Sequence, residues 1–263
     1  MLPVIAFPTI DPVAISLGPI AIRWYALAYI AGLLLGWWAV RRMNRGPAPL
    51  LSDKDTDDFL GWMALGVVLG GRLGYVLFYQ PGHYLADPLE ALMIWKGGMS
   101  FHGGMLGTAA AIIWFAHAKA IPTMALADQI ARVTPIGLFF GRIANFVNGE
   151  LYGRVSDVSW AMVFPHGGPL PRHPSQLYQA ALEGIALLIV LALAAKGSKG
   201  RVGHGFLTGL FLAGYAVARF VGEPFRQPDA FLGFLAFGTT MGQWLSLPML
   251  LVGLGVMWVF RRP

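Results

Sequence analysis

The 263-residue sequence contains no cysteine, so its fold uses no disulfide and its chemistry uses no thiolate of its own. Charged residues make up only 12% of the chain, whereas they are about a quarter of an ordinary soluble domain. Hydrophobic residues make up 56%, and the mean hydropathy is +0.61. A chain this apolar is not a water-soluble domain, and its composition indicates a lipid bilayer as its solvent.

Apolar runs separated by short polar stretches follow one another along the whole chain. In hydrocarbon every backbone polar group must be paired, so only helices or a closed barrel can cross a membrane. The runs are longer than the strands of about 10 residues that barrels use, which favours helices. We therefore predict one integral membrane domain, 1–263, that is all-α with about seven transmembrane helices. The expected spans are 20–40, 58–79, 100–118, 125–146, 175–195, 203–223 and 238–260.

The basic residues predict the orientation of these spans. A cluster of three arginines, Arg41, Arg42 and Arg45, follows the first span, while only Arg23 lies at its start. Because cytoplasmic loops carry the excess of Lys and Arg, we expect the N-terminus outside and the C-terminus inside, with no cleaved signal peptide. The longest outward connection, 147–174, is expected to form a small extracytoplasmic cap between the fourth and fifth spans.

Several classes of partner find no support in the sequence. The net charge of +6 is spread between apolar runs, so no nucleic-acid partner is expected. The six histidines lack the spacing of metal ligands, and no phosphate-binding loop, dinucleotide fingerprint or nucleophile elbow is present. We expect neither a metal nor a cofactor.

Charged residues within a span each need a partner, water or a function. In the sixth span Tyr215, Arg219 and Glu223 stand at helical spacing on one stripe, and in the fourth Arg142 and Asn145 share a face. The topology places all five near the outer leaflet. Two arginines at headgroup depth suit a lipid phosphate, because guanidinium stays charged and offers paired donors.

His102 opens the third span within a glycine-rich stretch, and Gly103 and Gly104 would let a bulky headgroup approach the backbone. Tyr25 lies in the outer part of the first span. Simpler readings stay open for all of these residues. Arg219 can neutralise Glu223, Arg142 can snorkel to the interface, and His102, Tyr25 and the asparagines can be interface or cap residues. Two further charges lie within spans, Arg72 and Glu183. The position of Glu183 near mid-span favours a polar contact between helices, and Arg72 has no assigned role.

Several segments along the chain form recognisable motifs. They are Asp11-Pro12, Ile22-Arg23-Trp24-Tyr25, Phe101-His102-Gly103-Gly104, 141–153 (from Gly141-Arg142 to Tyr152-Gly153), 173–178 (His173-Pro174 to Tyr178), Tyr215-x-x-x-Arg219-Phe220-x-x-Glu223 and Arg226-Gln227-Pro228-Asp229. Together these segments resemble the phosphatidylglycerol–prolipoprotein diacylglyceryl transferase family. The resemblance covers most of the chain, and Gln179 and Pro224 depart from the family pattern.

The resemblance implies a multi-pass enzyme of the bacterial inner membrane with its active site toward the outer leaflet. It would move the diacylglyceryl group of phosphatidylglycerol to the lipobox cysteine in the signal peptide of a prolipoprotein, form a thioether and release glycerol phosphate. Its partners are therefore phosphatidylglycerol, the prolipoprotein and membrane lipid.

On this hypothesis each candidate residue has a role. Arg142 and Arg219 hold the phosphate, and His102 takes the thiol proton, unless an arginine stabilises the thiolate instead. The supporting roles fall to Tyr25, Asn145, Glu150 and Tyr215 at the headgroup, to Gly103 and Gly104 beside it, to Glu223 next to Arg219, and to Gly153 in a tight turn of the cap. Two rivals stay open: a lipid scramblase or anion transporter, and an acyltransferase with His102 as its base.

Overall fold

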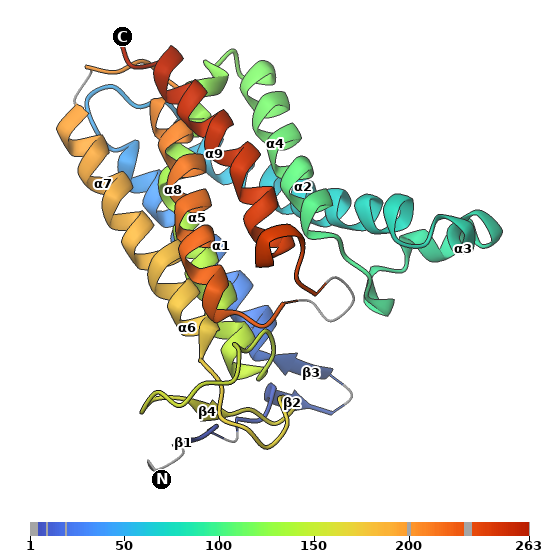
Figure 1. Cartoon of the computed structure of the whole chain (residues 1–263). Helices are drawn as coiled ribbons and strands as arrows, with labels where there is room; N and C mark the ends of the chain where they lie inside the picture. Colours follow the sequence, from blue (N-terminus) through green and yellow to red (C-terminus); the bar gives the residue numbers. More distant parts are fainter. Residues whose placement is uncertain (1–4, 9, 19, 199–200, 229–232, 263) are drawn as a thin grey trace. The chain divides into compact units, whose positions relative to one another are not determined.

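The computed structural model describes residues 5–8, 10–18, 20–198, 201–228 and 233–262. The chain forms two compact units by its internal contacts (Figure 1). The first combines Met1–Ala39 with Asp128–Pro263, and the second is Val40–Ala127. The prediction of a single membrane domain over 1–263 stays a prediction.

The first unit is built from five long helical segments: α1 (Trp24–Met43), α5 (Thr123–Val147), a continuous run of α6 (Ser175–Gln179), η3 (Ala180–Ala186) and α7 (Leu187–Ser198), then α8 (Phe206–Gly222) and α9 (Met241–Val259). α1 and α5 continue into the second unit at one end. Short 3₁₀ turns, η4 (Glu223–Phe225) and η5 (Ala236–Gly238), lie between α8 and α9.

Helices α8 and α9 pack closely because small residues face each other. A Cβ on Gly209 would come within 2.7 Å of the carbonyl oxygen of Gly253, so neither position has space for a side chain. Such contacts are typical of helices in membranes, where small residues let backbones approach. The start of α8 is fixed by Asp128, whose carboxylate accepts hydrogen bonds from the backbone of Gly205 at 2.8 Å and of Thr208 at 2.7 Å.

The second unit contains α2 (Asp53–Phe78), α3 (Pro81–Ala86), two 3₁₀ turns, η1 (Pro88–Leu92) and η2 (Ile94–Lys96), and α4 (Phe101–Ala118). Glycines again form the seam between the long helices. A Cβ on Gly74 of α2 would lie 2.7 Å from Cα of Gly103 on α4, and Gly70 and Gly107 are equally close to the facing backbone. The Ser52 side chain caps α2 by accepting from the amide of Asp55.

Four short strands lie together at one end of the first unit (Figure 1). β1 (Ile5–Ala6) pairs in parallel with β4 (Met162–Val163), and β2 (Val13–Leu17) pairs antiparallel with β3 (Ile20–Arg23). We predicted that the first span begins at residue 20, but the first helix begins at Trp24. The hairpin explains this difference. Ile20, Ile22 and their neighbours alternate in the pattern of a strand, and Gly18 adopts a positive φ of 58° between the two strands.

Each of the seven predicted spans coincides with a helical segment. Five of them are long and apolar enough to cross a membrane: Asp53–Phe78, Thr123–Val147, Ser175–Ser198, Phe206–Phe225 and Met241–Val259. The molecule is thus mostly helical and of the membrane class, as predicted, while the number of spans and their orientation stay predictions. The predicted cap is 147–174: Val147 is the last residue of α5, and residues 148–174 contain no long helix and only the two-residue strand β4.

Candidate functional site

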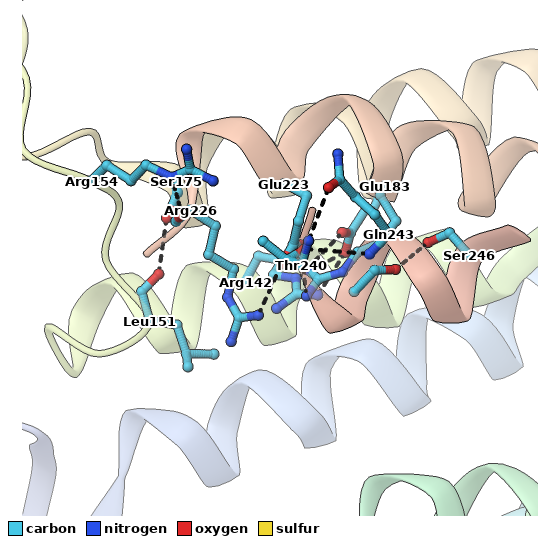
Figure 2. A network of polar contacts seen from close by, with 12 residues as sticks. Arg142, Leu151, Arg154, Ser175, Glu183, Glu223, Arg226, Thr240, Gln243 and Ser246 are labelled. Atoms are coloured by element: carbon cyan, nitrogen blue, oxygen red, sulfur yellow. Dashed lines mark hydrogen bonds and ion pairs between the residues drawn. The ribbon is translucent and has the colours of Figure 1, made fainter. Parts of the chain in front are cut away.

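Several charged side chains contact one another in the first unit, where α5, the middle of the α6–α7 segment and the end of α8 come together (Figure 2). Its centre is Glu183, whose side chain is fully buried. One carboxylate oxygen of Glu183 accepts from Nε of Arg142 at 2.9 Å and lies 2.8 Å from Nη2 of the same guanidinium. The other oxygen lies 3.5 Å from Nη1 of Arg219. One carboxylate therefore joins the two arginines that the sequence predicts as a pair.

Glu223 adds a further set of ion pairs on the other side of Arg219. Its carboxylate lies 3.2 Å from Nη2 of Arg219 and 3.5 Å from Nη1 of Arg226, and its side chain is 1% exposed. Three arginines and two glutamates make up this arginine–glutamate network, namely Arg142, Glu183, Arg219, Glu223 and Arg226. The formal charges of +3 and −2 leave +1. The arginine side chains keep between 12% and 16% of their surface exposed, and the ion pairs hold their guanidinium groups in place.

A widened helical turn places Glu183 at this point. Residues Ala180–Ala186 form a π-helix between α6 and α7. Such turns are rare in proteins, and those that occur are often found at functional sites. Gly184 lies against Phe139 of α5, where a Cβ would come within 2.7 Å of the Phe139 Cβ. Phe139 is one turn before Arg142, so the close approach at Gly184 brings Glu183 within reach of the guanidinium.

The predicted stripe on α8 is confirmed as a set of neighbours. Tyr215 interacts electrostatically with Arg142, Arg219 contacts both glutamates, and Glu223 occupies the C-cap of α8. The reading in which Arg219 and Glu223 only neutralise each other is therefore incomplete, because Arg219 also pairs with Glu183 on another helix.

Asn145 and Glu150 form a second polar group next to the end of α5. Nδ2 of Asn145 donates to Oε1 of Glu150 at 2.7 Å, and the Asn145 carbonyl accepts from the Glu150 amide at 3.0 Å. The turn between them needs Gly149, which has a positive φ of 65°. The hydroxyl of Tyr25 interacts electrostatically with both Glu150 and Arg142. Tyr25 also packs on Tyr29, with 5.1 Å between ring centroids. These contacts bring Tyr25 and Glu150 to the same end of the first unit as Arg142.

Gly153 lies where three backbone segments meet. Its amide donates to the carbonyl of His173 at 2.8 Å, and it bridges to Arg226 in antiparallel fashion. A Cβ at this position would be 2.6 Å from both Cβ and the carbonyl oxygen of His173, and closer still to the carbonyl of Phe225. We predicted a tight turn here, but the structure shows an extended bridge in which a side chain has no room.

The other predicted residues belong to the second unit. His102 is exposed near the start of α4, and the Ser100 hydroxyl caps that helix by accepting from the amide of Gly103 at 3.2 Å. Gly103 packs against Gly70 and Gly74 of α2, and Gly104 lies near the carbonyl of Val67. These glycines have a packing role within the unit, and their predicted contact with a headgroup stays a prediction, as does the role of His102.

The structure also accounts for Arg72. Its guanidinium is buried and donates to the carbonyls of Ala91 at 2.8 Å, Glu90 at 2.6 Å, Gly97 at 2.5 Å and Gly98 at 3.0 Å. Arg72 thus fixes the segment that leads from η1 to the start of α4, which is a structural role within the second unit.

Sequence reasoning left out two members of the network and one neighbour. Glu183 was assigned only a contact between helices, and Arg226 was quoted only as part of a motif whose last residue, Asp229, lies outside the described residues. The i, i+3 spacing of Glu223 and Arg226 was the available signal. Gln179, noted from the sequence only as a departure from the family pattern, is 1% exposed, and within the described part of the chain neither amide atom finds a hydrogen-bond partner. No group of three potential metal ligands occurs among the described residues.

The fold and the site define a multi-helix membrane protein with a buried arginine–glutamate network at one end of its helices. The model of the prolipoprotein diacylglyceryl transferase family matches residues 12–259, so the chain belongs to this family. Proteins named phosphatidylglycerol–prolipoprotein diacylglyceryl transferase are similar to it over almost their whole length. The protein of Rhodospirillum rubrum is 56% identical (100% of this chain, 96% of the relative), and that of Paramagnetospirillum magneticum is 59% identical (98% and 97%).

Proposed function

We propose that this protein transfers the diacylglyceryl group of phosphatidylglycerol to the lipobox cysteine in the signal peptide of a prolipoprotein. The family and the names of its relatives support the reaction and both substrates. The observation that carries the site is the joining of Arg142 and Arg219 through one buried carboxylate, that of Glu183. Two guanidinium groups held at neighbouring positions match the oxygens of a phosphodiester.

In this mechanism the cysteine sulfur attacks the carbon of the diacylglyceryl group that carries the phosphate ester. The new C–S bond is the thioether, the C–O bond to phosphate breaks, and glycerol phosphate leaves with the electron pair. Negative charge therefore grows on the phosphate oxygens in the transition state. Arg142 and Arg219 stabilise this charge, and prearranged electrostatic contacts of this kind are usually the largest catalytic contribution.

The thiol must lose its proton before or during the attack. Its ordinary pKa of about 8.5 leaves little thiolate at neutral pH, so a base is useful. His102 is our candidate for this base, alone or through water. An arginine that stabilises the thiolate is the alternative, and Arg226 adds a third cation to the network.

The remaining predicted residues support the headgroup. Asn145 and Glu150, already hydrogen-bonded at 2.7 Å, orient its glycerol hydroxyls, with Tyr25 and Tyr215 beside them. Glu223 fixes Arg219, and Gly103 and Gly104 allow a close approach near His102. Gly153 bridges to Arg226 and has no room for a Cβ beside the carbonyl of Phe225, so segment 148–174 is tied to the residues that follow α8, which supports our proposal that the cap, 147–174, lies over the site.

For the membrane topology we propose seven spans in the bacterial inner membrane, with the N-terminus outside and the site toward the outer leaflet. Two ion pairs with the start of α2 place Arg41 and Lys119 at the same end of the second unit, as a common inner side for both requires. Arg41 pairs with Asp53 at 2.9 Å, and Lys119 pairs with Asp55 at 2.5 Å. The hydrogen bond to the Asp55 carboxylate raises the pKa of Lys119, so this lysine keeps its positive charge.

The test uses purified protein, phosphatidylglycerol vesicles and a lipobox peptide, followed by mass spectrometry of the peptide. We expect a peptide that carries diacylglyceryl, no product with a cysteine-to-serine peptide, and little transfer by Arg142→Ala and Arg219→Ala variants that still insert and fold. Near-normal turnover by both variants would contradict the proposal that Arg142 and Arg219 hold the lipid phosphate. Lipid movement without a modified peptide would favour the transporter, and use of an activated acyl donor would favour the acyltransferase.

A further inference from the structure

Gly242, at the start of α9, lies directly against the carboxylate of Glu223. A Cβ on Gly242 would lie 2.7 Å from the carboxyl carbon of Glu223 and 2.8 Å from each of its oxygens. No Cβ tolerates such distances, so the absence of a side chain at position 242 leaves the space that the carboxylate occupies. Nothing in the sequence pattern assigned a role to this glycine.

The backbone around Gly242 is held in place from three sides. Thr240 and Gln243 form a capping box, in which the amide of Thr240 donates to Oε1 of Gln243 at 3.1 Å (Figure 2). The Ser246 hydroxyl donates to the carbonyl of Gly242 at 2.7 Å. Nε1 of Trp244 donates to the Thr239 hydroxyl at 2.8 Å. The start of the helix therefore does not give way when a methyl group is added.

The Glu223 carboxylate is the movable partner in this contact. It is the end of a flexible side chain, it is 1% exposed, and its only ion pairs among the described residues are with Arg219 and Arg226. A group that pushes this carboxylate away from α9 must also move it relative to those guanidinium groups. Arg219 also pairs with Glu183. A displaced Glu223 carboxylate therefore disturbs the position of Arg219 relative to Arg142, the other arginine that we assign to the lipid phosphate.

We propose that Gly242 is a positioning residue of the transfer reaction: it provides the seat for the Glu223 carboxylate, which in turn orients Arg219 toward the lipid phosphate. The proposal rests on the transferase function above. Gly242 itself touches no substrate and acts only through Glu223. The negative carboxylate beside the first turn of α9 also has a favourable interaction with the helix dipole, which explains why the seat lies at this end of the helix.

The main variant is Gly242→Ala, and the matched control is Gly255→Ala. Both changes replace glycine by alanine in α9, but a Cβ at position 255 meets nothing within 4 Å. We expect Gly242→Ala to lower kcat and kcat/KM together by about tenfold or more, since misplacement of about 1 Å can cost about 100-fold. Gly255→Ala should stay within about twofold of the wild type. Equal turnover of the two variants would overturn the proposal.

A double-mutant cycle with Glu223→Asp distinguishes positioning from general damage. The shorter side chain withdraws from the seat, so adding Gly242→Ala to Glu223→Asp should cost less than about twofold, in contrast to its cost in the wild type. The same cost in both backgrounds would show that the methyl group acts through something other than Glu223, and would overturn the proposal.

A measurement without turnover keeps the two proposals separate. The Nε–H resonance of Arg219 in ¹⁵N-arginine-labelled protein in nanodiscs is assigned by its loss in Arg219→Lys. This resonance should shift in Gly242→Ala and stay in place in Gly255→Ala. An unmoved resonance in Gly242→Ala overturns the role of Gly242. If the wild type transfers nothing to the peptide, the proposed function fails, while the resonance still reports whether Gly242 sets Arg219.

Discussion

The carboxylate of Glu183 accepts a hydrogen bond from Nε of Arg142 at 2.9 Å, and no part of the Glu183 side chain is exposed. Taking two charges out of water is costly, and only good geometry with further partners compensates for it. Here the second partner is Arg219, at 3.5 Å from the other oxygen. A buried carboxylate that two arginines share keeps two like charges next to each other, which is the arrangement that a doubly charged leaving group requires.

Removal of the Glu183 carboxylate should therefore damage both stability and function. We expect Glu183→Ala to lower the free energy of unfolding by about 3 kcal/mol, because two guanidinium groups lose their buried counter-charge. Glu183→Gln keeps an oxygen that accepts from Arg142 and should cost clearly less. Thermal unfolding in nanodiscs measures both. If Glu183→Gln is as stable as the wild type, the charge of Glu183 contributes nothing to the network; if it is as unstable as Glu183→Ala, the oxygen that Gln keeps does not compensate for the lost charge.

Exchange of the two arginines for lysine tests whether geometry matters as well as charge. Nε and Nη2 of Arg142 both point to one carboxylate oxygen, and an ammonium group cannot reproduce this fork. Arg142→Lys and Arg219→Lys should each lower kcat/KM by roughly 10-fold to 100-fold. Arg261→Lys, near the end of the chain and over the Trp258 ring, is the control and should transfer normally. Full activity of the two site variants would mean that positive charge alone suffices.

Gln179 and Gln176 should respond in opposite ways to the loss of their amide groups. Within the described residues its amide is buried with neither atom hydrogen-bonded, whereas Nε2 of the neighbouring Gln176 donates to the carbonyl of Glu150 at 2.6 Å. Gln179→Leu should raise the free energy of unfolding by about 1 kcal/mol, because a buried unsatisfied amide is costly. Gln176→Leu loses a hydrogen bond and should lower it. If Gln179→Leu is destabilised as much as Gln176→Leu, Gln179 has a partner in solution that its surroundings here do not supply.

The class of the protein and most members of the site could be predicted from the sequence. Apolar runs of about 20 residues have few alternatives to helices in lipid, and the spacing of Tyr215, Arg219 and Glu223 made them neighbours on one face. Arg142 also had to find a partner, because a charge in a span is costly. These conclusions follow from local rules, which is why the structure agrees with them.

The rest depends on tertiary contacts that no local rule contains. The π-helix that contains Glu183 lies against α5 at the close contact of Gly184 with Phe139, about 45 positions apart in the chain. The contact between Gly242 and Glu223 joins two helices through the absence of a side chain, and Gly153 is extended because it bridges to Arg226. In the same way, the sequence predicts that Gly103 lets a headgroup approach the backbone beside His102, whereas its packing against α2 depends on a tertiary contact.

Gly153 gives a strong test of the contacts between segment 148–174 and the rest of the first unit. The atoms that a Cβ would meet there include the backbone carbonyls of His173 and Phe225, which cannot turn away like a side chain. Gly153→Ala should therefore lower the free energy of unfolding by about 1–3 kcal/mol and reduce transfer. Gly61→Ala, with nothing within 4 Å of its Cβ, is the matched control. Thermal unfolding of both variants decides, and equal stability would show that the segment relaxes freely.

His173 should make stability depend on pH. Burial lowers the pKa of its imidazole below the ordinary value of 6.5, with Asp157 as a smaller opposing influence. Nδ1 of His173 lies 3.1 Å from the hydroxyl of Tyr178. The unfolded chain binds the proton more readily than the folded protein, so stability falls as the pH drops below about 6.5 and levels off below the lower pKa of the folded state.

More than about one pH unit above 6.5, His173 is neutral in both states and adds no pH dependence of its own. The melting temperature of the wild type should therefore decline between pH 7 and pH 5, and His173→Gln, which keeps a hydrogen-bonding group but does not titrate, should decline less. Other titrating groups are common to both proteins, so the difference between the two curves isolates His173. Parallel curves would mean that the imidazole titrates as it does in the unfolded chain, and a steeper decline in the variant would reverse the sign of the predicted shift.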